Sequence, residues 1–269
     1  MIRFSYIVID RLASFGSEAA VRDVLAKLKQ TGYDGVEINL TEPLGVDLDA
    51  LEVWLDELDL VIPSFLTGEA YNDGLCLSSP IAEIRSGAVE RLVSYLDVAQ
   101  RFNAILVVGL LQGLRIDEPD PEVANARIAN GLQQVAAAAE NKGVELVMEP
   151  VNHLQVGFNN SVAEVVELID RIGSPAVRPM VDTVHMNIEE NSLTEPIRRC
   201  GNALRHVHLC ESNGALFGSG CIDFTAVLRA LDDVGYDGFA SVKVYRRPLL
   251  EGAQTSIEHL SELRRRSGS

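Results

Sequence analysis

Acidic and imidazole side chains stand close to the ends of three short β-branched runs in the second half of the sequence. Glu149 ends VELVME, Asp182 ends RPMVD, and LRHVHL carries His206 and His208 two residues apart, on one face of a strand. Carboxylate and imidazole groups together suit a divalent cation such as Mn²⁺ or Mg²⁺. Carboxylates at strand ends also cap loops, and strand histidines also fill cores, so the spacing alone leaves both interpretations open.

The last β-branched run, GFASVKVY, ends in a different kind of side chain. Lys243 alternates with the apolar residues Val242 and Val244, so a strand buried on both faces would point an ammonium group into the protein. A buried ammonium is stable only beside compensating negative charge. Lys243 therefore belongs with the acidic residues of the neighbouring runs.

Eight repeats of a short apolar run, a loop and an amphipathic helix position these residues. The predicted strands are 2–8, 34–40, 60–66, 104–110, 144–149, 178–182, 204–209 and 238–245. The predicted helices are 17–31, 47–58, 81–102, 121–142, 161–172, 193–200, 223–235 and 250–265. This alternation predicts an α/β protein, a (β/α)8 TIM barrel with one domain over residues 1–269.

A doubly wound open sheet is the competing arrangement. It usually carries a glycine-rich phosphate loop after its first strand, where this chain has IDRLASFGSE, and neither GxGxxG nor GxxxxGK[ST] occurs. In a barrel, functional side chains emerge at the C-terminal ends of the strands. Glu149, Asp182, the histidines and Lys243 all lie at or near such ends.

Composition limits the partners. The chain has 269 residues, with 23 Lys and Arg against 39 Asp and Glu, a net charge of −16 that disfavours nucleic acid as a partner. No apolar run reaches the roughly 18 residues of a membrane span, and the N-terminus enters a strand-like run at once, so we expect neither a membrane span nor a signal peptide. Four cysteines without CxxC spacing indicate reduced thiols in a cytoplasmic protein.

Three segments resemble one known family. MEPVN, VDTVHMNIEE and HVHLCESN…GSGCIDF are similar, in this order, to segments of the xylose-isomerase-like TIM barrel superfamily. The resemblance is closest to sugar phosphate isomerases/epimerases and ketose 3-epimerases. It implies a divalent metal, Mn²⁺ or Mg²⁺, held by Glu149, Asp182 and His208. It also implies that His185 and Asn152 contact a sugar-like substrate.

Three positions depart from the family pattern. Lys243 stands where the family has a glutamate that is both the fourth metal ligand and a second base. Gly214 replaces a common substrate-binding arginine, and Gln155 replaces a substrate-contacting carboxylate. We still expect Gln155 to contact substrate, but these changes favour a substrate other than a simple free ketose.

The lysine has several possible roles. It can act as a neutral base near the metal, replace the metal with its ammonium, swing aside to bind an acidic substrate group, or be structural in a barrel that has lost activity. Two carboxylates, one ammonium and a 2+ ion sum to +1, whereas the same side chains without the ion sum to −1. We favour a retained metal on three protein ligands, with Glu149 as the proton-abstracting base and Lys243 as a second acid/base or substrate clamp.

The resulting functional hypothesis is a sugar isomerase or epimerase acting on a small polyhydroxy carbonyl compound. The alternative is a lyase or dehydratase that eliminates from a keto-sugar, keto-inositol or oxidised glycoside. An abasic-site nuclease is disfavoured, because the chain has only five histidines and is strongly acidic. A non-catalytic subunit is a further alternative, and homo-oligomerisation is possible.

Overall fold

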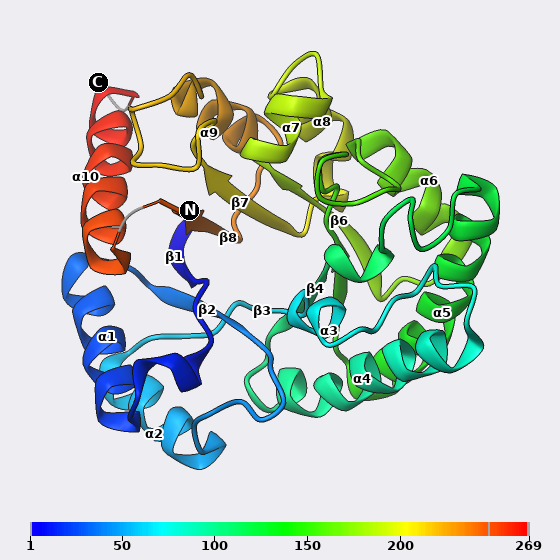
Figure 1. Ribbon diagram of the computed structural model, residues 1–269. Coiled ribbons are helices and arrows are strands. Elements are labelled where there is room, and N and C mark those ends of the chain that lie inside the picture. Colours follow the sequence, from blue (N-terminus) through cyan, green and yellow to red (C-terminus); the bar gives the residue numbers. More distant parts are fainter. Residues whose placement is uncertain (1, 247, 268–269) are drawn as a thin grey trace.

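Eight parallel strands close into a barrel in the computed structural model, which describes residues 2–246 and 248–267. The strand order follows the sequence, and β1 pairs with β8 to close the ring (Figure 1). The strands are β1 (Arg3–Val8), β2 (Gly35–Asn39), β3 (Ser64–Leu66), β4 (Ile105–Val108), β5 (Leu146–Met148), β6 (Val177–Asp182), β7 (His206–Cys210) and β8 (Phe239–Lys243). The predicted (β/α)8 fold is confirmed.

Helices surround the barrel, and red α10 lies beside blue α1 (Figure 1). The α-helices are α1 (Glu18–Thr31), α2 (Leu48–Leu58), α3 (Glu69–Asn72), α4 (Ala82–Arg101), α5 (Pro121–Lys142), α6 (Val162–Ile172), α7 (Thr183–Glu189), α8 (Glu195–Cys200), α9 (Phe224–Asp233) and α10 (Leu249–Ser267). The short 3-10 helices are η1 (Leu12–Phe15), η2 (Leu110–Gln112) and η3 (Gly201–Ala203).

Two short helices were not predicted, and both lie on loops that follow strands. α3 forms inside the segment 67–80, and α7 begins directly after β6, with the Asp182 side chain accepting a hydrogen bond from the Val184 backbone N–H. A single turn or two of helix is too short to show a 3.6-residue hydrophobic period. Both helices border the end of the barrel where the acidic residues gather.

The barrel interior is divided into an apolar and a polar half. Ile105, Val107, Val147 and Met180 pack together on the side of β4 to β6. The opposite side holds a buried polar layer from β1, β2, β3, β7 and β8, made of Ser5, Glu37, Ser64, His206 and Ser241. The polar layer needs internal partners, because buried polar groups are costly when left unpaired.

Sequence-local signals set the helix ends. Ser161 and Glu164 form a complete capping box at the start of α6, and Asp120 caps α5 just before Pro121. Gly143 ends α5 in the left-handed conformation. Within the described residues, no helix is both long and apolar enough to cross a membrane.

Candidate active site

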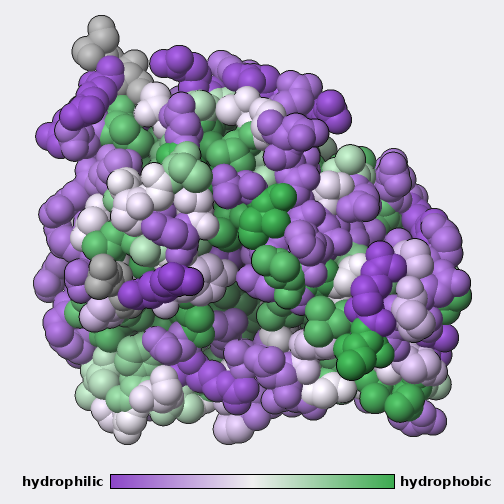
Figure 2. Space-filling model, turned by 45° about the horizontal axis from the view of Figure 1, so that its top comes forward, coloured by the Kyte–Doolittle hydropathy of each residue, from purple (hydrophilic) through white to green (hydrophobic). Residues whose placement is uncertain are grey.

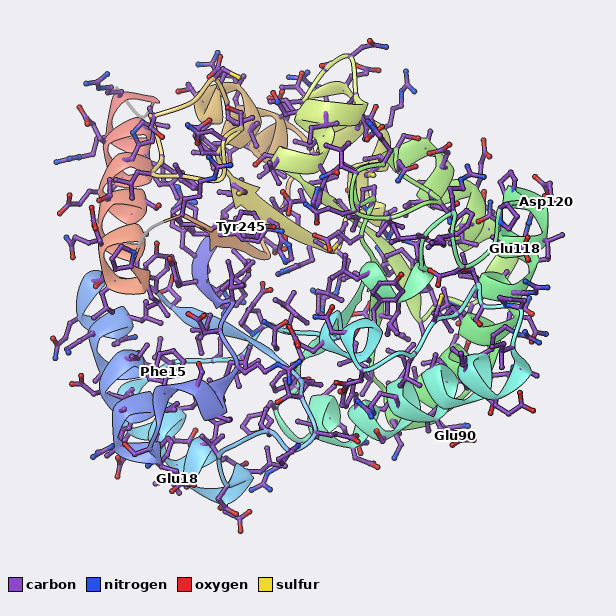
Figure 3. All side chains as sticks on the ribbon, in the orientation of Figure 1. Phe15, Glu18, Glu90, Glu118, Asp120 and Tyr245 are labelled. Carbon is purple, nitrogen blue, oxygen red and sulfur yellow. The ribbon has the colours of Figure 1, made fainter. Side chains whose placement is uncertain are left out.

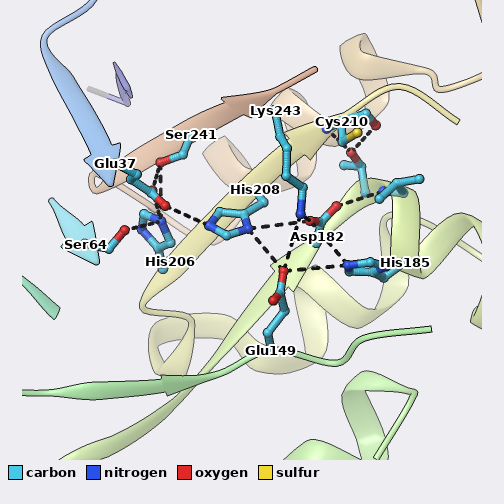
Figure 4. Close-up of polar contacts among 12 residues, drawn as sticks. Glu37, Ser64, Glu149, Asp182, His185, His206, His208, Cys210, Ser241 and Lys243 are labelled. Carbon is cyan, nitrogen blue, oxygen red and sulfur yellow. Dashed lines mark hydrogen bonds and ion pairs between the residues drawn. The ribbon is translucent and has the colours of Figure 1, made fainter. Parts of the chain in front are cut away.

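Side chains from four successive strands meet at the C-terminal end of the barrel (Figure 4). The register pairs Asp182 of β6 with His208 of β7, and Cys210 of β7 with Lys243 of β8. Glu149 follows β5 directly. These four chemistry-bearing residues are buried and lie within ion-pair distance of at least one other member: Glu149, Asp182, His208 and Lys243.

The Lys243 ammonium lies between two carboxylates. Its Nζ is 2.5 Å from Asp182 Oδ2 and 3.6 Å from Glu149 Oε1. Burial by itself lowers the pKa of Lys243, but Asp182 chiefly offsets this effect, so the pKa lies well above its ordinary value. Lys243 is therefore a charged ammonium at neutral pH, which disfavours its use as a neutral base.

The charge of Lys243 in turn keeps the Glu149 and Asp182 carboxylates ionised. Burial by itself raises the pKa of Glu149 and of Asp182, but the charge of Lys243 leads the opposing effects, and both pKa values lie below their ordinary range. A base that is ionised at neutral pH is able to accept a proton. Glu149 also borders the open cavity, whereas Asp182 is fully buried.

His208 is held between the acidic cluster and a third carboxylate below it. Its Nδ1 is 3.2 Å from Glu149 Oε1, and its Nε2 is 3.1 Å from Glu37 Oε2. Burial by itself lowers the pKa of His208, but Glu37 and the other carboxylates raise it well above its ordinary value. Nε2–H donates to Glu37, so Nδ1 is the nitrogen directed at the site, and it would bind a metal only after losing its own proton.

Glu37 is the centre of the polar layer beneath the site. Its Oε1 is 2.5 Å from His206 Nε2, and Ser241 Oγ donates a hydrogen bond to the same oxygen. His206 is thus a paired interior residue. Burial raises the pKa of Glu37, but His206 and His208 together lower it below its ordinary value. In the sequence, Glu37 is marked only by its place near the end of the predicted strand 34–40.

His185 borders the cavity and is oriented by Asn152. Asn152 Nδ2 lies 2.7 Å from His185 Nδ1 and donates to it, so the ring proton is on Nε2. Nε2 is 3.8 Å from both Glu149 Oε1 and Asp182 Oδ2. Burial lowers the pKa of His185, and the ring is a neutral donor. Asn152 is not among the described residues that line the cavity. Its contact with the site is the hydrogen bond to His185.

The cavity above the cluster has one polar and one apolar wall. Figure 2 shows the hollow at this end of the molecule and hydrophobic side chains on its border. Gln155 lines its mouth and is exposed, and Glu69 of α3, paired with Arg11, lines the other side. The apolar wall comes from β1, β3 and the segments around β4 and β5: Ile7, Ile9, Leu66, Val107, Leu110 and Val151.

Tyr245 explains the absence of a side chain at position 214. Tyr245 follows β8 at the barrel mouth, whereas Glu18 and Glu90 lie on outer helices (Figure 3). A Cβ at Gly214 would lie 3.0 Å from Tyr245 Cδ2, and Gly214 has a φ of +65° that disfavours other residues. A side chain at position 214 would require a shift of the Tyr245 ring and a strained backbone.

The segment ESN…GSGCIDF is held together by Glu211. Its carboxylate accepts hydrogen bonds from the backbone N–H groups of Ser212, Gly218 and Ile222. A Cβ at Gly220 would overlap Glu211 Oε1. This part of the motif therefore shapes the loop beside the site.

The donor set fits a divalent metal. One ligand atom each from Glu149, Asp182 and His208 lies within 4.8 Å of the others, and all three residues are buried. Within the described part of the chain, Asp182 Oδ2 accepts no hydrogen bond of standard geometry and is held by its ion pairs. These buried groups could bind a metal, because two carboxylates and one imidazole are suitable ligands for a hard to borderline ion.

Glu37 changes the electrostatic balance of the site. A third buried carboxylate lowers the sum for a metal-loaded site with charged Lys243 and neutral His208 from +1 to 0. Without the ion, the ammonium and a protonated His208 face three carboxylates, which sum to −1. The net charge of the buried cluster is therefore near zero both with and without the ion, and burial favours a small net charge.

Glu37→Gln tests whether this charge stabilises the fold. The folded-state pKa of Glu37 lies below its unfolded value of about 4, so its contribution is present above that pH and is lost as the pH falls through the folded-state pKa. We expect a loss of about 2 kcal/mol in unfolding free energy near neutral pH. The difference from the wild type should shrink below a pH of about 4.

Urea denaturation at several pH values provides the measurement. Glu57→Gln is the matched control, because Glu57 forms an exposed pair with Arg22 and should change stability by less than about 1 kcal/mol. A deficit of Glu37→Gln that is constant with pH would contradict a role for the carboxylate charge.

Comparison with known proteins places this geometry in a family. A model of the xylose isomerase-like TIM barrel matches residues 25–263. The D-psicose 3-epimerase of Ruminiclostridium cellulolyticum is 31% identical, over 86% of this chain and 80% of that protein. The ketose 3-epimerase of Arthrobacter globiformis is 28% identical, over 81% and 75%. A solved structure of L-ribulose 3-epimerase has a TM-score of 0.85 at 24% identity, covering 100% of this chain and 97% of that one.

The family model spans most of the chain, and these relatives are sugar epimerases, enzymes of the isomerase class. The resemblance inferred from MEPVN and VDTVHMNIEE is confirmed. The chain belongs to the xylose isomerase-like TIM barrel family.

Proposed function

We propose that this protein is a sugar epimerase that inverts a carbon next to the carbonyl group of a small polyhydroxy compound. The observation that carries the proposal is a buried, ionised Glu149 at the floor of a cavity beside a fixed cationic group, in a chain related to ketose 3-epimerases. Proton loss beside a carbonyl needs such a base and a stabiliser for the negative oxygen that forms.

Glu149 is the proposed base. Its carboxylate accepts the proton from the carbon, and the electron pair of the broken C–H bond moves to the carbonyl oxygen, giving an enediolate. The Lys243 ammonium, the proposed second acid, then gives a proton to the opposite face of the planar carbon, and the electron pair returns from the oxygen to form the new C–H bond of the epimer. Proton exchange with water restores ionised Glu149 and protonated Lys243. Glu149 is 8% exposed, so it reaches the cavity while being shielded from most water.

Lys243 and His185 are the proposed stabilisers of the enediolate oxygens. The Lys243 ammonium borders the cavity, and the His185 Nε2–H lies on the same side. Gln155 at the mouth is a donor and acceptor for a distal hydroxyl, and Asn152 contributes by orienting His185. In this proposal Lys243 serves as an acid or electrostatic clamp.

A divalent ion, Mn²⁺ or Mg²⁺, is the proposed cofactor. Glu149, Asp182 and His208 would hold it, and it would polarise the carbonyl and the adjacent hydroxyl of the substrate.

Elimination is the less favoured reaction, because the curated relatives described above are epimerases. We also propose that residues 1–269 form one domain and that the protein is a cytoplasmic homo-oligomer. The four cysteines are free, and the acidic surface disfavours nucleic acid.

Hydrogen exchange tests the proposed reaction. The protein, supplied with Mn²⁺, is incubated in D₂O with a panel of ketopentoses, ketohexoses and keto-sugars. We expect deuterium at the carbon next to the carbonyl and appearance of the epimer, both measured by NMR. Absence of exchange across the panel would refute the proposal, and release of water from the sugar would show elimination in its place.

Glu149→Gln should slow this exchange by about 10²- to 10⁴-fold, because the amide cannot accept the proton. Glu52→Gln, a change of the same kind in an exposed pair with Arg101, is the control and should leave the rate unaltered. A Glu149→Gln rate close to that of the wild type would assign the base to another residue.

Gly109→Ala tests the positioning of Glu149. A Cβ at Gly109 would lie 2.7 Å from Glu149 Oε2 and 2.9 Å from Val151 Cγ2, so the carboxylate must move. We expect the exchange rate to fall by about 10- to 100-fold, the scale for an ångström of misplacement. Gly87→Ala in α4 is the matched control, since its Cβ would meet only the end of the Leu75 side chain. Equal rates in both variants would contradict the steric argument.

A further inference from the structure

We infer that Lys243 is a tethered cation that competes with a divalent ion for Asp182 and Glu149. The chain then binds metal more weakly than the same barrel with a neutral or acidic residue at position 243. This inference deepens the proposed function, because it rests on the same site and on its use of a divalent ion.

The first argument is positional. The ammonium already contacts both carboxylates, at 2.5 Å from Asp182 Oδ2 and 3.6 Å from Glu149 Oε1. An ion held by Asp182 and Glu149 would need these same carboxylate oxygens as ligands. The ammonium and the ion would therefore compete for the same carboxylate oxygens.

The second argument is that, within residues 2–246 and 248–267, the ammonium forms ion pairs with these two carboxylates alone. Among the described residues, Asp182 and Glu149 are its ion-pair partners, and its side chain is 8% exposed. The Tyr245 ring also lies close, with its centroid 5.5 Å from Nζ. An ion that enters must displace the ammonium from both carboxylates toward a much weaker partner.

The third argument is the charge of the buried cluster. Glu37, Glu149 and Asp182 supply the negative charge that attracts an ion, and Lys243 cancels part of it. Methionine at position 243 makes the cluster one unit more negative, and glutamate makes it two units more negative. Metal affinity should rise in that order, because the repulsion between like charges a few ångströms apart is removed and then reversed.

Metal binding measured without a sugar tests the inference. Chelator-stripped wild type, Lys243→Met and Lys243→Glu are titrated with Mn²⁺, and free Mn²⁺ is followed by electron paramagnetic resonance. We expect binding about 10-fold tighter for Lys243→Met and about 100-fold or more tighter for Lys243→Glu than for the wild type. The rise in thermal unfolding midpoint with Mn²⁺ should follow the same order.

The control is Lys29→Met, which removes an exposed lysine paired with Asp59 and should bind Mn²⁺ like the wild type. Equal affinities in the wild type and both position 243 variants would overturn the inference, as would absence of binding in Lys243→Glu. If a variant does not fold without metal, its recovery of structure on addition of Mn²⁺ is measured by circular dichroism. Recovery supports the inference and failure to recover overturns it.

The metal titration and the hydrogen-exchange experiment can fail independently of each other. No substrate is present in the titration, so an inactive protein can still show the predicted order of affinities. An active epimerase can equally bind Mn²⁺ with one affinity in all three forms.

Discussion

The pairing of the Lys243 ammonium with Asp182 and Glu149 is the interaction on which the chemistry of this barrel depends. An isolated charge is excluded from a protein interior, and here each charge is retained because the others lie within a few ångströms. The same contacts keep Glu149 ionised and Lys243 protonated. Loss of either partner would change the protonation of the rest.

The layer below the site provides the support for this cluster. Glu37 reaches across the barrel from β2 and fixes His206 and His208 of β7, and Ser241 of β8 completes its contacts. The apolar half of the interior lies under β4 to β6. The polar layer thus lies on the side where partners from neighbouring strands satisfy it, which keeps the cost of burying it low.

This chain shares its barrel fold with the xylose isomerase-like family. On one fold, a change of a few side chains around the site can change the chemistry. Gly214 with the Tyr245 ring over it, Gln155 at the mouth and Lys243 at the floor occur on different segments yet border one cavity or its rim. Their concentration around the cavity favours an altered substrate or metal requirement on an otherwise retained scaffold.

The sequence by itself determined the barrel, because eight repeats of strand and helix are local patterns that burial of apolar faces enforces. It also predicted that Glu149, Asp182, His208 and Lys243 share one end, since parallel strand ends meet there. Only the tertiary structure decided which groups pair. Glu37 and Gly109 lie far along the chain from the residues they touch, and Asn152 turned out to contact His185. Closure of the eight-stranded barrel brings these residues together, and the hydrophobic periodicity of the sequence cannot predict such contacts.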